Sequence, residues 1–401
     1  MKTYVSIAAM AAIVALAGST AVSQTQSVFV ALPATVAAPA DNPTTPEKVA
    51  LGRMLFWDPI LSGQRDVSCA TCHHPDFGYA ESLDLSIGTG GVGLGATRAF
   101  APGHAVRLVK RNSPTVLNAA FNGITMSGEY DPATAPMFWD SRVNSLEVQA
   151  LEPIKALEEM RGETYTEDRA LAEVVARLAA NAEYRTLFTR AFGSRNAVSA
   201  DNLGRAIAAF QRSLVTTNAP FDRYMRGDAA AMTPAQIQGM NRFQSTGCTN
   251  CHNGPMFSDF KTHVLAVPDN GKLAATDAGI NGTYAFRTAS LRNLAYTAPY
   301  MHNGVFDDLN DVVNFYQRIS RGGGRGGRNG GGGRGVNANV ARDQIDPFAR
   351  QLNMRGGGGG GGRGGRGRDN DLVAFLGALN DEGFDRTIPE RVPSGLKVGG
   401  N

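Results

Sequence analysis

Apolar residues recur at helical spacing in several stretches of the chain. The clearest is residues 369–379, where Leu372, Phe375, Leu376 and Leu379 stand at i, i+3, i+4 and i+7, the pattern of a helix that packs one face on a core. Few stretches alternate between apolar and polar residues as strands do. The chain is therefore predicted to be mainly α, with helices over residues 45–56, 166–192, 199–214, 233–243 and 369–379.

Two of these helices begin in the same way. Thr45-Pro46 and Thr233-Pro234 each combine a threonine N-cap with a proline at the first helical position. Each is followed closely by a pair of cysteines, which indicates a faint internal duplication. A length of 401 residues also favours two domains. We place the boundary near residues 193–197, which gives an N-terminal domain of residues 24–195 and a C-terminal domain of residues 196–401.

The first 23 residues have the pattern of a secretory signal. Lys2 is followed by an apolar, alanine-rich run from Tyr4 to Ala17, and Ala21-Val22-Ser23 supplies small residues for a signal peptidase. The apolar run is shorter than the roughly 20 residues that span a bilayer. We predict cleavage after Ser23, export to the periplasm and no membrane span in the mature protein, with an uncleaved anchor as the alternative.

The composition is that of a globular protein, but its positive charge is local. Apolar residues make up 42% of the chain and charged residues 19%, with a net charge of +3. Residues 321–368 hold ten arginines against two aspartates, so the rest of the chain is negative. Ordering so many glycines costs backbone entropy. We therefore expect a disordered Gly/Arg-rich insertion at about 321–368 and no nucleic-acid partner, with an RNA-binding segment as the alternative.

The four cysteines form two pairs, each followed by a histidine. The sequences are Cys69-Ala-Thr-Cys72-His73 and Cys248-Thr-Asn-Cys251-His252. This is the attachment signal of c-type haem, in which two thiols reach the vinyl groups of one porphyrin and the histidine ligates the iron. A zinc site or a thioredoxin-like motif would not explain the histidine after both pairs. The sequence predicts two covalently attached haem c groups.

Six further segments around these motifs resemble one family. They are Leu55-Phe-Trp-Asp-Pro59, Arg111-Asn-Ser-Pro-Thr-Val-Leu-Asn118, Phe138-Trp-Asp140, Glu158-Glu-Met160, Ser290-Leu-Arg-Asn293 and Ala298-Pro-Tyr-Met-His-Asn-Gly304. From about Thr45 to Asp381 the chain resembles the bacterial di-haem cytochrome c peroxidases, and among them the MauG-like members. The resemblance implies two cytochrome c-like domains, each with one haem c, and haems that face a shared interface.

The resemblance also implies roles for individual residues. His73 and His252 would be the proximal iron ligands, and Trp139 would relay electrons between the haems. Gln149, Pro153 and Glu159 match the family's distal pocket, where a carboxylate of raised pKa can move a proton during peroxide cleavage. Glu158, next to Glu159, is the alternative. Trp57 is assigned a structural role.

Two further features of the family match this chain. His104 lies eight residues before Asn112, where some members place a histidine that caps the peroxidatic iron until the other haem is reduced; the alternative is a surface loop histidine. Asn112, Thr297 and Pro299 match a calcium site between the domains. His74 and His263 match no motif, and we expect ordinary structural roles for both.

Tyr316 lies where members of the family place the second ligand of the C-terminal haem iron. Some members have a methionine there, whereas MauG-like members have a tyrosine. A phenolate would lower the reduction potential of the haem, and a methionine would raise it. Phe315 could fill the core in place of Tyr316, which favours ligation by Tyr316. Met301 and Met354 remain the alternatives, as does a purely structural Tyr316.

These matches predict a periplasmic peroxidase that reduces hydrogen peroxide to water with electrons passed through its second haem. The electron donor would be a periplasmic cytochrome c or a cupredoxin, and the family often forms homodimers. Two alternatives stay open: MauG-like, peroxide-dependent oxidation of residues in a partner protein, and a di-haem electron-transfer cytochrome without catalytic activity. Tyr316 indicates MauG-like chemistry, whereas His104 indicates activation by reduction.

Overall fold

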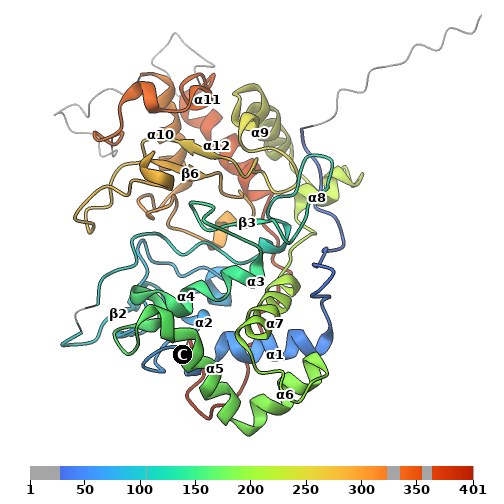
Figure 1. Cartoon of the computed structure of the whole chain (residues 1–401). Helices are drawn as coiled ribbons and strands as arrows, with labels where there is room; N and C mark the ends of the chain where they lie inside the picture. Colours follow the sequence, from blue (N-terminus) through green and yellow to red (C-terminus); the bar gives the residue numbers. More distant parts are fainter. Residues whose placement is uncertain (1–27, 105, 323–334, 355–363, 401) are drawn as a thin grey trace, which may run out of the picture.

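The computed structural model describes residues 28–104, 106–322, 335–354 and 364–400, with side chains from residue 371 in the last range (Figure 1). The predicted signal sequence lies outside these residues, as do residues 323–334 and 355–363 of the Gly/Arg-rich stretch. Within the described ranges, no helix is both long and apolar enough to cross a membrane.

The described structure is helix-rich with few, small sheets, which confirms the predicted mainly α class. The helices are α1 (Pro46–Trp57), α2 (Cys69–Cys72), α3 (Leu146–Gln149), α4 (Glu152–Lys155), α5 (Glu167–Ala180), α6 (Ala182–Phe192), α7 (Ala200–Ser213), α8 (Pro220–Met225), α9 (Pro234–Ser245), α10 (Leu309–Ser320), α11 (Pro347–Arg350) and α12 (Gly364–Gly377). The strands form three antiparallel pairs: β1 (Gly91–Val92) with β2 (Ala99–Phe100), β3 (Pro136–Met137) with β4 (Val143–Asn144), and β5 (Thr262–Val264) with β6 (Ala285–Arg287).

Local capping explains where the principal helices begin. The side chain of Thr45 accepts a hydrogen bond from Lys48 N at the start of α1, and Thr233 forms a capping box with Gln236 at the start of α9. The single helix predicted for residues 166–192 is instead two helices. Asn181 ends α5 in an extended conformation, and its side chain caps α6.

The molecule has two lobes, one with α1 and α7 and the other with α9 and α12 (Figure 1). In each lobe the two helices pack closely at a glycine. In one lobe, Gly52 of α1 lies against the backbone of Ala206 and the Cβ of Phe210 in α7. In the other, Gly239 of α9 lies against Asp371 and the Cβ of Phe375 in α12. A β-carbon at either glycine would overlap a backbone carbonyl oxygen of the partner helix. The internal duplication indicated by the sequence is therefore repeated in the packing.

Two segments that follow the boundary predicted near residue 195, α7 and the C-terminal segment, pack in the core around α1. The boundary itself stays a prediction. Helix α7 belongs to the first core, where Leu203, Ile207 and Phe210 are fully buried with residues of α1. The C-terminal segment also returns to this core through Phe384, Val392 and Val398. Figure 1 shows the C-terminus beside the lobe that contains α1, far from α12.

The C-terminal segment is fixed to the first lobe by hydrogen bonds. Gly399 N donates to the carbonyl of Trp57 at 2.8 Å, and Ser394 Oγ donates to Asp58 Oδ1 at 2.6 Å. The hydroxyl of Tyr79 donates to the carbonyl of Asp385 at 2.7 Å. Trp57 is fully buried beneath this segment, in agreement with its structural assignment.

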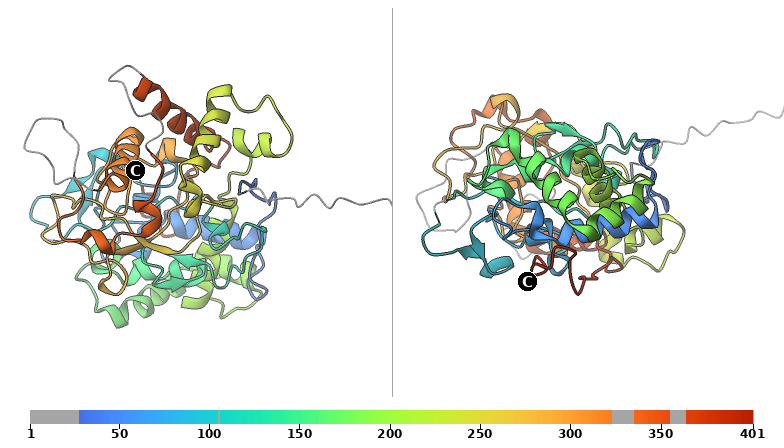
Figure 2. Two further views of the ribbon diagram at one scale, coloured as in Figure 1. Left: turned by 90° about the horizontal axis from the view of Figure 1, so that it is seen from above. Right: turned by 60° about the horizontal axis from the view of Figure 1, so that its bottom comes forward.

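Residues 335–354, which the sequence predicts to be part of one disordered insertion, have a defined conformation. They contain α11, and Val340, Ile345 and Ala349 are buried in a core with Phe315 of α10. Burial of these apolar side chains supplies the free energy that orders the segment. Figure 2 shows this segment packed on the body of the molecule near α10.

We predict that Gly239→Ala destabilises the protein by about 1–3 kcal/mol, because the new methyl group would be forced into the backbone of α12. The free energy of unfolding measured with denaturant tests this. Gly377→Ala is the matched control, since Gly377 is exposed near the end of α12 and a β-carbon there meets no atom within 4 Å. Equal stability of the two variants would contradict close packing at Gly239.

Candidate active site

Both Cys-x-x-Cys-His motifs open into a single cavity of about 1200 Å³. This volume exceeds the ~300–1,000 Å³ typical of a pocket for one small ligand. The predicted site residues that line the cavity are Cys69, Cys72, His73, Asn112, Trp139, Gln149, Pro153, Glu158, Glu159, Cys248, Cys251, His252, Thr297, Pro299 and Tyr316. The two lobes therefore bring together residues that are far apart in the sequence.

The loop after the first motif fixes the imidazole of His73. Its Nδ1 lies 3.1 Å from the carbonyl oxygen of Tyr79, and burial lowers the pKa of His73 to about 4. The ring is therefore neutral and donates from Nδ1, which leaves Nε2 as the free lone pair. This is the arrangement found where a histidine ligates a metal and its other nitrogen is oriented by a backbone carbonyl.

The second motif repeats this arrangement. Nδ1 of His252 lies 2.9 Å from the carbonyl oxygen of Phe257, and burial lowers the pKa of His252. Tyr316, on α10, lines the cavity, and burial raises the pKa of its hydroxyl. Phe315 is fully buried in the core beside it, as the sequence predicts. Met301 and Met354 also line the cavity.

Trp139 lies in the turn between β3 and β4. Its indole Nε1 donates to the carbonyl of Asn112 at 2.9 Å. Its own carbonyl accepts from the backbone N–H of Arg287 at 2.7 Å. Phe138 and Ser141 on either side have φ of 65° and 52°, values that are uncommon for residues other than glycine. Contacts on both sides thus hold the indole in a strained turn.

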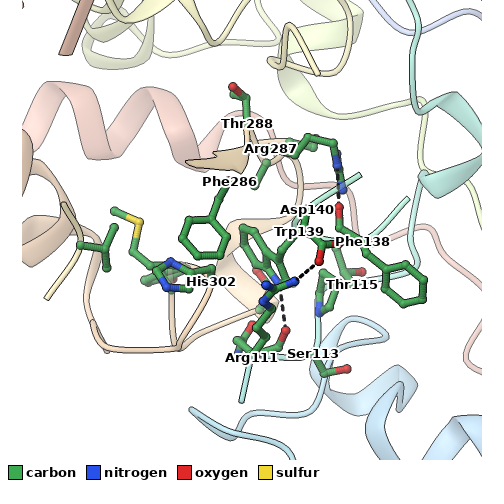
Figure 3. A pocket seen from close by; sticks show the side chains of 18 of the residues that line it. Arg111, Ser113, Thr115, Phe138, Trp139, Asp140, Phe286, Arg287, Thr288 and His302 are labelled. Carbon is green, nitrogen blue, oxygen red and sulfur yellow. Dashed lines mark hydrogen bonds and ion pairs between the residues drawn. The ribbon is translucent and has the colours of Figure 1, made fainter. Parts of the chain in front are cut away.

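An arginine beside Trp139 joins two acidic residues. Arg111 donates to Asp140 and to Asp277, each at 2.6 Å, and its guanidinium lies 5.4 Å from the centre of the Phe286 ring. Figure 3 shows this group, with His302 stacked against Phe286. The His302 and Phe286 rings are 3.7 Å apart and nearly parallel, and burial lowers the pKa of His302 to about 4.

The residues expected at the distal side come from three successive short helices. Gln149 ends α3, Pro153 lies in α4, and Glu159 lies in a π-helix, Leu157–Arg161. Such single π-turns often occur at functional sites. The carbonyl of Glu159 accepts from Thr89 N at 2.9 Å, and burial raises the pKa of its carboxyl group to about 7. Glu159 can therefore both take up and release a proton near neutral pH.

His104 does not line the cavity. It is exposed in a loop, and its ring packs against Gly90, at the end of the loop that contacts Glu159. Asn112, Thr297 and Pro299 do share the cavity, and the side-chain amide of Asn112 donates to the carbonyl of Leu83 at 2.8 Å. That contact leaves the amide oxygen of Asn112 available as an acceptor.

Several cavity residues were not identified from the sequence. Arg111, Phe286, Arg287 and His302 surround Trp139, and His263 lies beside Cys251. Arg111 and His302 belong to the segments that carry the family resemblance, and those segments are the sequence signal for them. The position of His263 depends on the pairing of β5 with β6, which its local sequence does not specify.

The residues present fit two haem c groups. No disulfide joins the four cysteines, and each pair lines the cavity beside its histidine. The thiols, the neutral imidazoles and a cavity too large for one small ligand together match the demands of two covalent porphyrins.

Comparisons with known proteins agree with this site. The pattern of the family described as di-haem cytochrome c peroxidase matches residues 46–230. The chain is 37% identical to methylamine utilization protein MauG of Methylorubrum extorquens, over 71% of this chain and 72% of that protein. It is 33% identical to cytochrome c551 peroxidase of Pseudomonas aeruginosa, over 72% of this chain and 77% of that protein.

A solved structure has the same fold. A MauG-like protein associated with microbial copper homeostasis superposes with a TM-score of 0.66 at 27% identity, over 88% of this chain and 95% of that one. The chain thus matches relatives over most of their length and carries both haem-attachment motifs at one cavity. It belongs to the di-haem cytochrome c peroxidase family.

Proposed function

We propose that this protein reduces hydrogen peroxide in the periplasm, at the haem attached to Cys69 and Cys72, with electrons that pass through the haem attached to Cys248 and Cys251. The observation that carries this proposal is Glu159, a buried carboxyl group of raised pKa in the same cavity as His73. When bound, haem supplies the iron and the redox chemistry. The overall reaction combines hydrogen peroxide, two protons and two electrons into two water molecules.

The proton transfer is assigned to Glu159. Its carboxylate accepts a proton from one peroxide oxygen and returns it to the other, which then leaves as water. Gln149, with donor and acceptor atoms in the same cavity, orients the peroxide. Burial of Glu159 raises the pKa of its carboxyl group, so that a large share of this group is protonated near neutral pH and can donate a proton.

The electron relay is assigned to Trp139, between the two motifs. The indole N–H donates to a backbone carbonyl oxygen, which is too weak a base to take up the proton. An electron can therefore leave the indole ring while the proton stays on its nitrogen. The carboxylate of Asp140 beside it favours a positive charge on the indole, although the arginines that pair with Asp140 offset this effect.

A small periplasmic cytochrome c or cupredoxin would supply the electrons, and the name of the Pseudomonas relative, cytochrome c551 peroxidase, supports a cytochrome.

His252 and Tyr316 are proposed to ligate the second iron, and Asn112, Thr297 and Pro299 to bind Ca²⁺ through oxygen atoms. The free amide oxygen of Asn112 supports the calcium assignment, because Ca²⁺ prefers carbonyl and amide oxygens. The exposed position of His104, away from the cavity, supports MauG-like activation without prior reduction.

An EPR spectrum of the oxidised holoprotein tests this mode. We predict one high-spin and one low-spin ferric signal, with the high-spin signal lost after one equivalent of peroxide, because no protein ligand other than His73 is proposed for the first iron. Two low-spin signals that respond to peroxide only after half-reduction would assign His104 to the iron. Two low-spin signals that never respond would favour an electron carrier and contradict the peroxidase proposal.

We predict that Glu159→Gln slows the reaction with peroxide by about 10²–10⁴-fold without loss of haem. In the unchanged protein the rate should rise with pH through about 7, because the carboxylate form is the base, and this rise should disappear in the variant. Stopped-flow rates between pH 5 and 9 measure both effects. Glu158→Gln is the matched control, and a larger loss there than at Glu159 would reverse the assignment.

We predict that Tyr316→Phe changes the low-spin EPR signal and raises the reduction potential of the C-terminal haem, because an anionic ligand is lost. Tyr300→Phe is the matched control. Tyr300 lines the same cavity, but its hydroxyl donates to the carbonyl of Leu294 at 2.9 Å. An unchanged low-spin signal in Tyr316→Phe would exclude Tyr316 as a ligand and leave Met301 and Met354 to be tested.

A further inference from the structure

A cluster of three charged side chains lies beside the second cysteine of the C-terminal motif. His263 Nε2 is 2.9 Å from Asp259 Oδ2, and His263 Nδ1 is 2.7 Å from Asp346 Oδ2. The same Nδ1 lies 4.0 Å from Cys251 Sγ. We call Asp259, His263 and Asp346 the acid–imidazole cluster. Both His263 and Asp346 line the cavity.

The cluster is not arranged to bind a metal ion. Cys251, Asp259 and His263 lie close enough to be considered as ligands. However, a thioether to haem removes the thiolate of Cys251, and both nitrogens of His263 already face carboxylates. A metal ligand needs a free lone pair on one ring nitrogen, which this geometry does not leave.

The contacts instead hold a positive imidazolium between two negative carboxylates. Each ring nitrogen lies within hydrogen-bonding distance of a carboxylate oxygen, so both nitrogens carry a proton, and the hydrogen bond to Asp259 is the main cause that raises the pKa of His263. Burial acts to raise the pKa of Asp259, but its hydrogen bonds with His263 and Thr288 lower it overall. One positive charge and two negative charges leave the cluster with one net negative charge.

Backbone hydrogen bonds hold the cluster in place next to the C-terminal Cys-x-x-Cys-His motif. Asp259 N donates to the carbonyl of Cys251 at 2.8 Å, and Asp346 N donates to the carbonyl of Val264 at 2.9 Å. Phe257, two residues before Asp259, accepts the hydrogen bond from His252 that orients the axial ring. The charge is therefore fixed beside Cys251, which would attach the edge of the porphyrin.

We propose that the acid–imidazole cluster lowers the reduction potential of the C-terminal haem by fixing one net negative charge beside its Cys251 attachment. The proposal rests on the assignment of His252 as the iron ligand in the proposed function. Reduction adds one electron from the donor to the ferric iron, with no bond made or broken. A nearby negative charge opposes that addition and favours the ferric form, and it acts through a low-dielectric interior.

The cluster contains both positive and negative side chains, so the proposal can be tested by the direction in which the midpoint potential shifts. Asp346→Asn removes a negative charge and should raise the midpoint potential, because Asp259 still holds His263 protonated. His263→Gln removes the positive charge, keeps hydrogen-bonding groups and should lower the potential. Each shift is expected to be about tenfold in the ferric-to-ferrous equilibrium, or 59 mV for one electron. If the two residues only stabilised the structure, their substitution would not shift the midpoint potential in opposite directions.

The measurement is spectroelectrochemical titration of the purified holoprotein. Asp346→Glu keeps the charge and should stay at the original potential. Asp343→Asn is the second control, because Asp343 is exposed on the same segment and its charge is screened by solvent. Should Asp346→Asn fail to incorporate haem, Asp346→Ser replaces it, because serine also caps a helix such as α11, and the same upward shift is expected.

Shifts of the same sign in Asp346→Asn and His263→Gln, or no shift in either, would overturn the proposal. The low-spin EPR signal of each variant shows whether the axial ligands are retained. Peroxide turnover is measured separately. Absence of peroxide turnover in the unchanged holoprotein, together with shifts of opposite sign in the variants, would count against the peroxidase function and leave the role of the cluster standing.

Discussion

In each lobe the histidine of the Cys-x-x-Cys-His motif is oriented by a hydrogen bond from its Nδ1 to a backbone carbonyl five or six residues later. His73 bonds to Tyr79 and His252 to Phe257. This bond sets the tautomer and the direction in which Nε2 points, and so determines where each porphyrin can lie. The surrounding structure serves to keep these two loops in place. Gly52 and Gly239 allow the helix before each motif to pack against the backbone of a later helix, which would be impossible with a larger residue.

The two lobes share this arrangement but differ in the chemistry around it. The first has a buried carboxyl group, Glu159, with a pKa raised to about 7 by burial, which is suited to proton transfer. The second has the acid–imidazole cluster, which places a net negative charge near the motif, and Tyr316 lines the cavity there. These different surroundings are what the proposed division between peroxide chemistry in one lobe and electron transfer in the other requires, because a protein tunes each iron through its surroundings.

The region between the lobes is held together by charge pairs and by a strained turn. Arg111 joins Asp140, the residue that follows Trp139, to Asp277 in a distant segment of the chain. Buried pairs of this kind contribute little net stability, since the loss of hydration offsets much of their attraction. Their value is geometric: they fix Trp139 within the cavity that both motifs share. The C-terminal segment, which returns from α12 to Trp57, joins the lobes a second time.

The sequence by itself determined the features that depend on neighbouring residues. Each Cys-x-x-Cys-His motif specifies its chemistry within five residues, and Thr45 and Thr233 mark helix starts through bonds to residues three positions later. The family resemblance supplied Trp139, Gln149, Glu159 and Tyr316, all of which line the cavity. Only the tertiary structure decided contacts such as His263 with Asp346, 83 residues apart, and Arg111 with Asp277, 166 residues apart. The physical reason is that hydrogen bonds and ion pairs act over a few ångströms in space, and no local pattern specifies which distant segments the folded chain will place side by side.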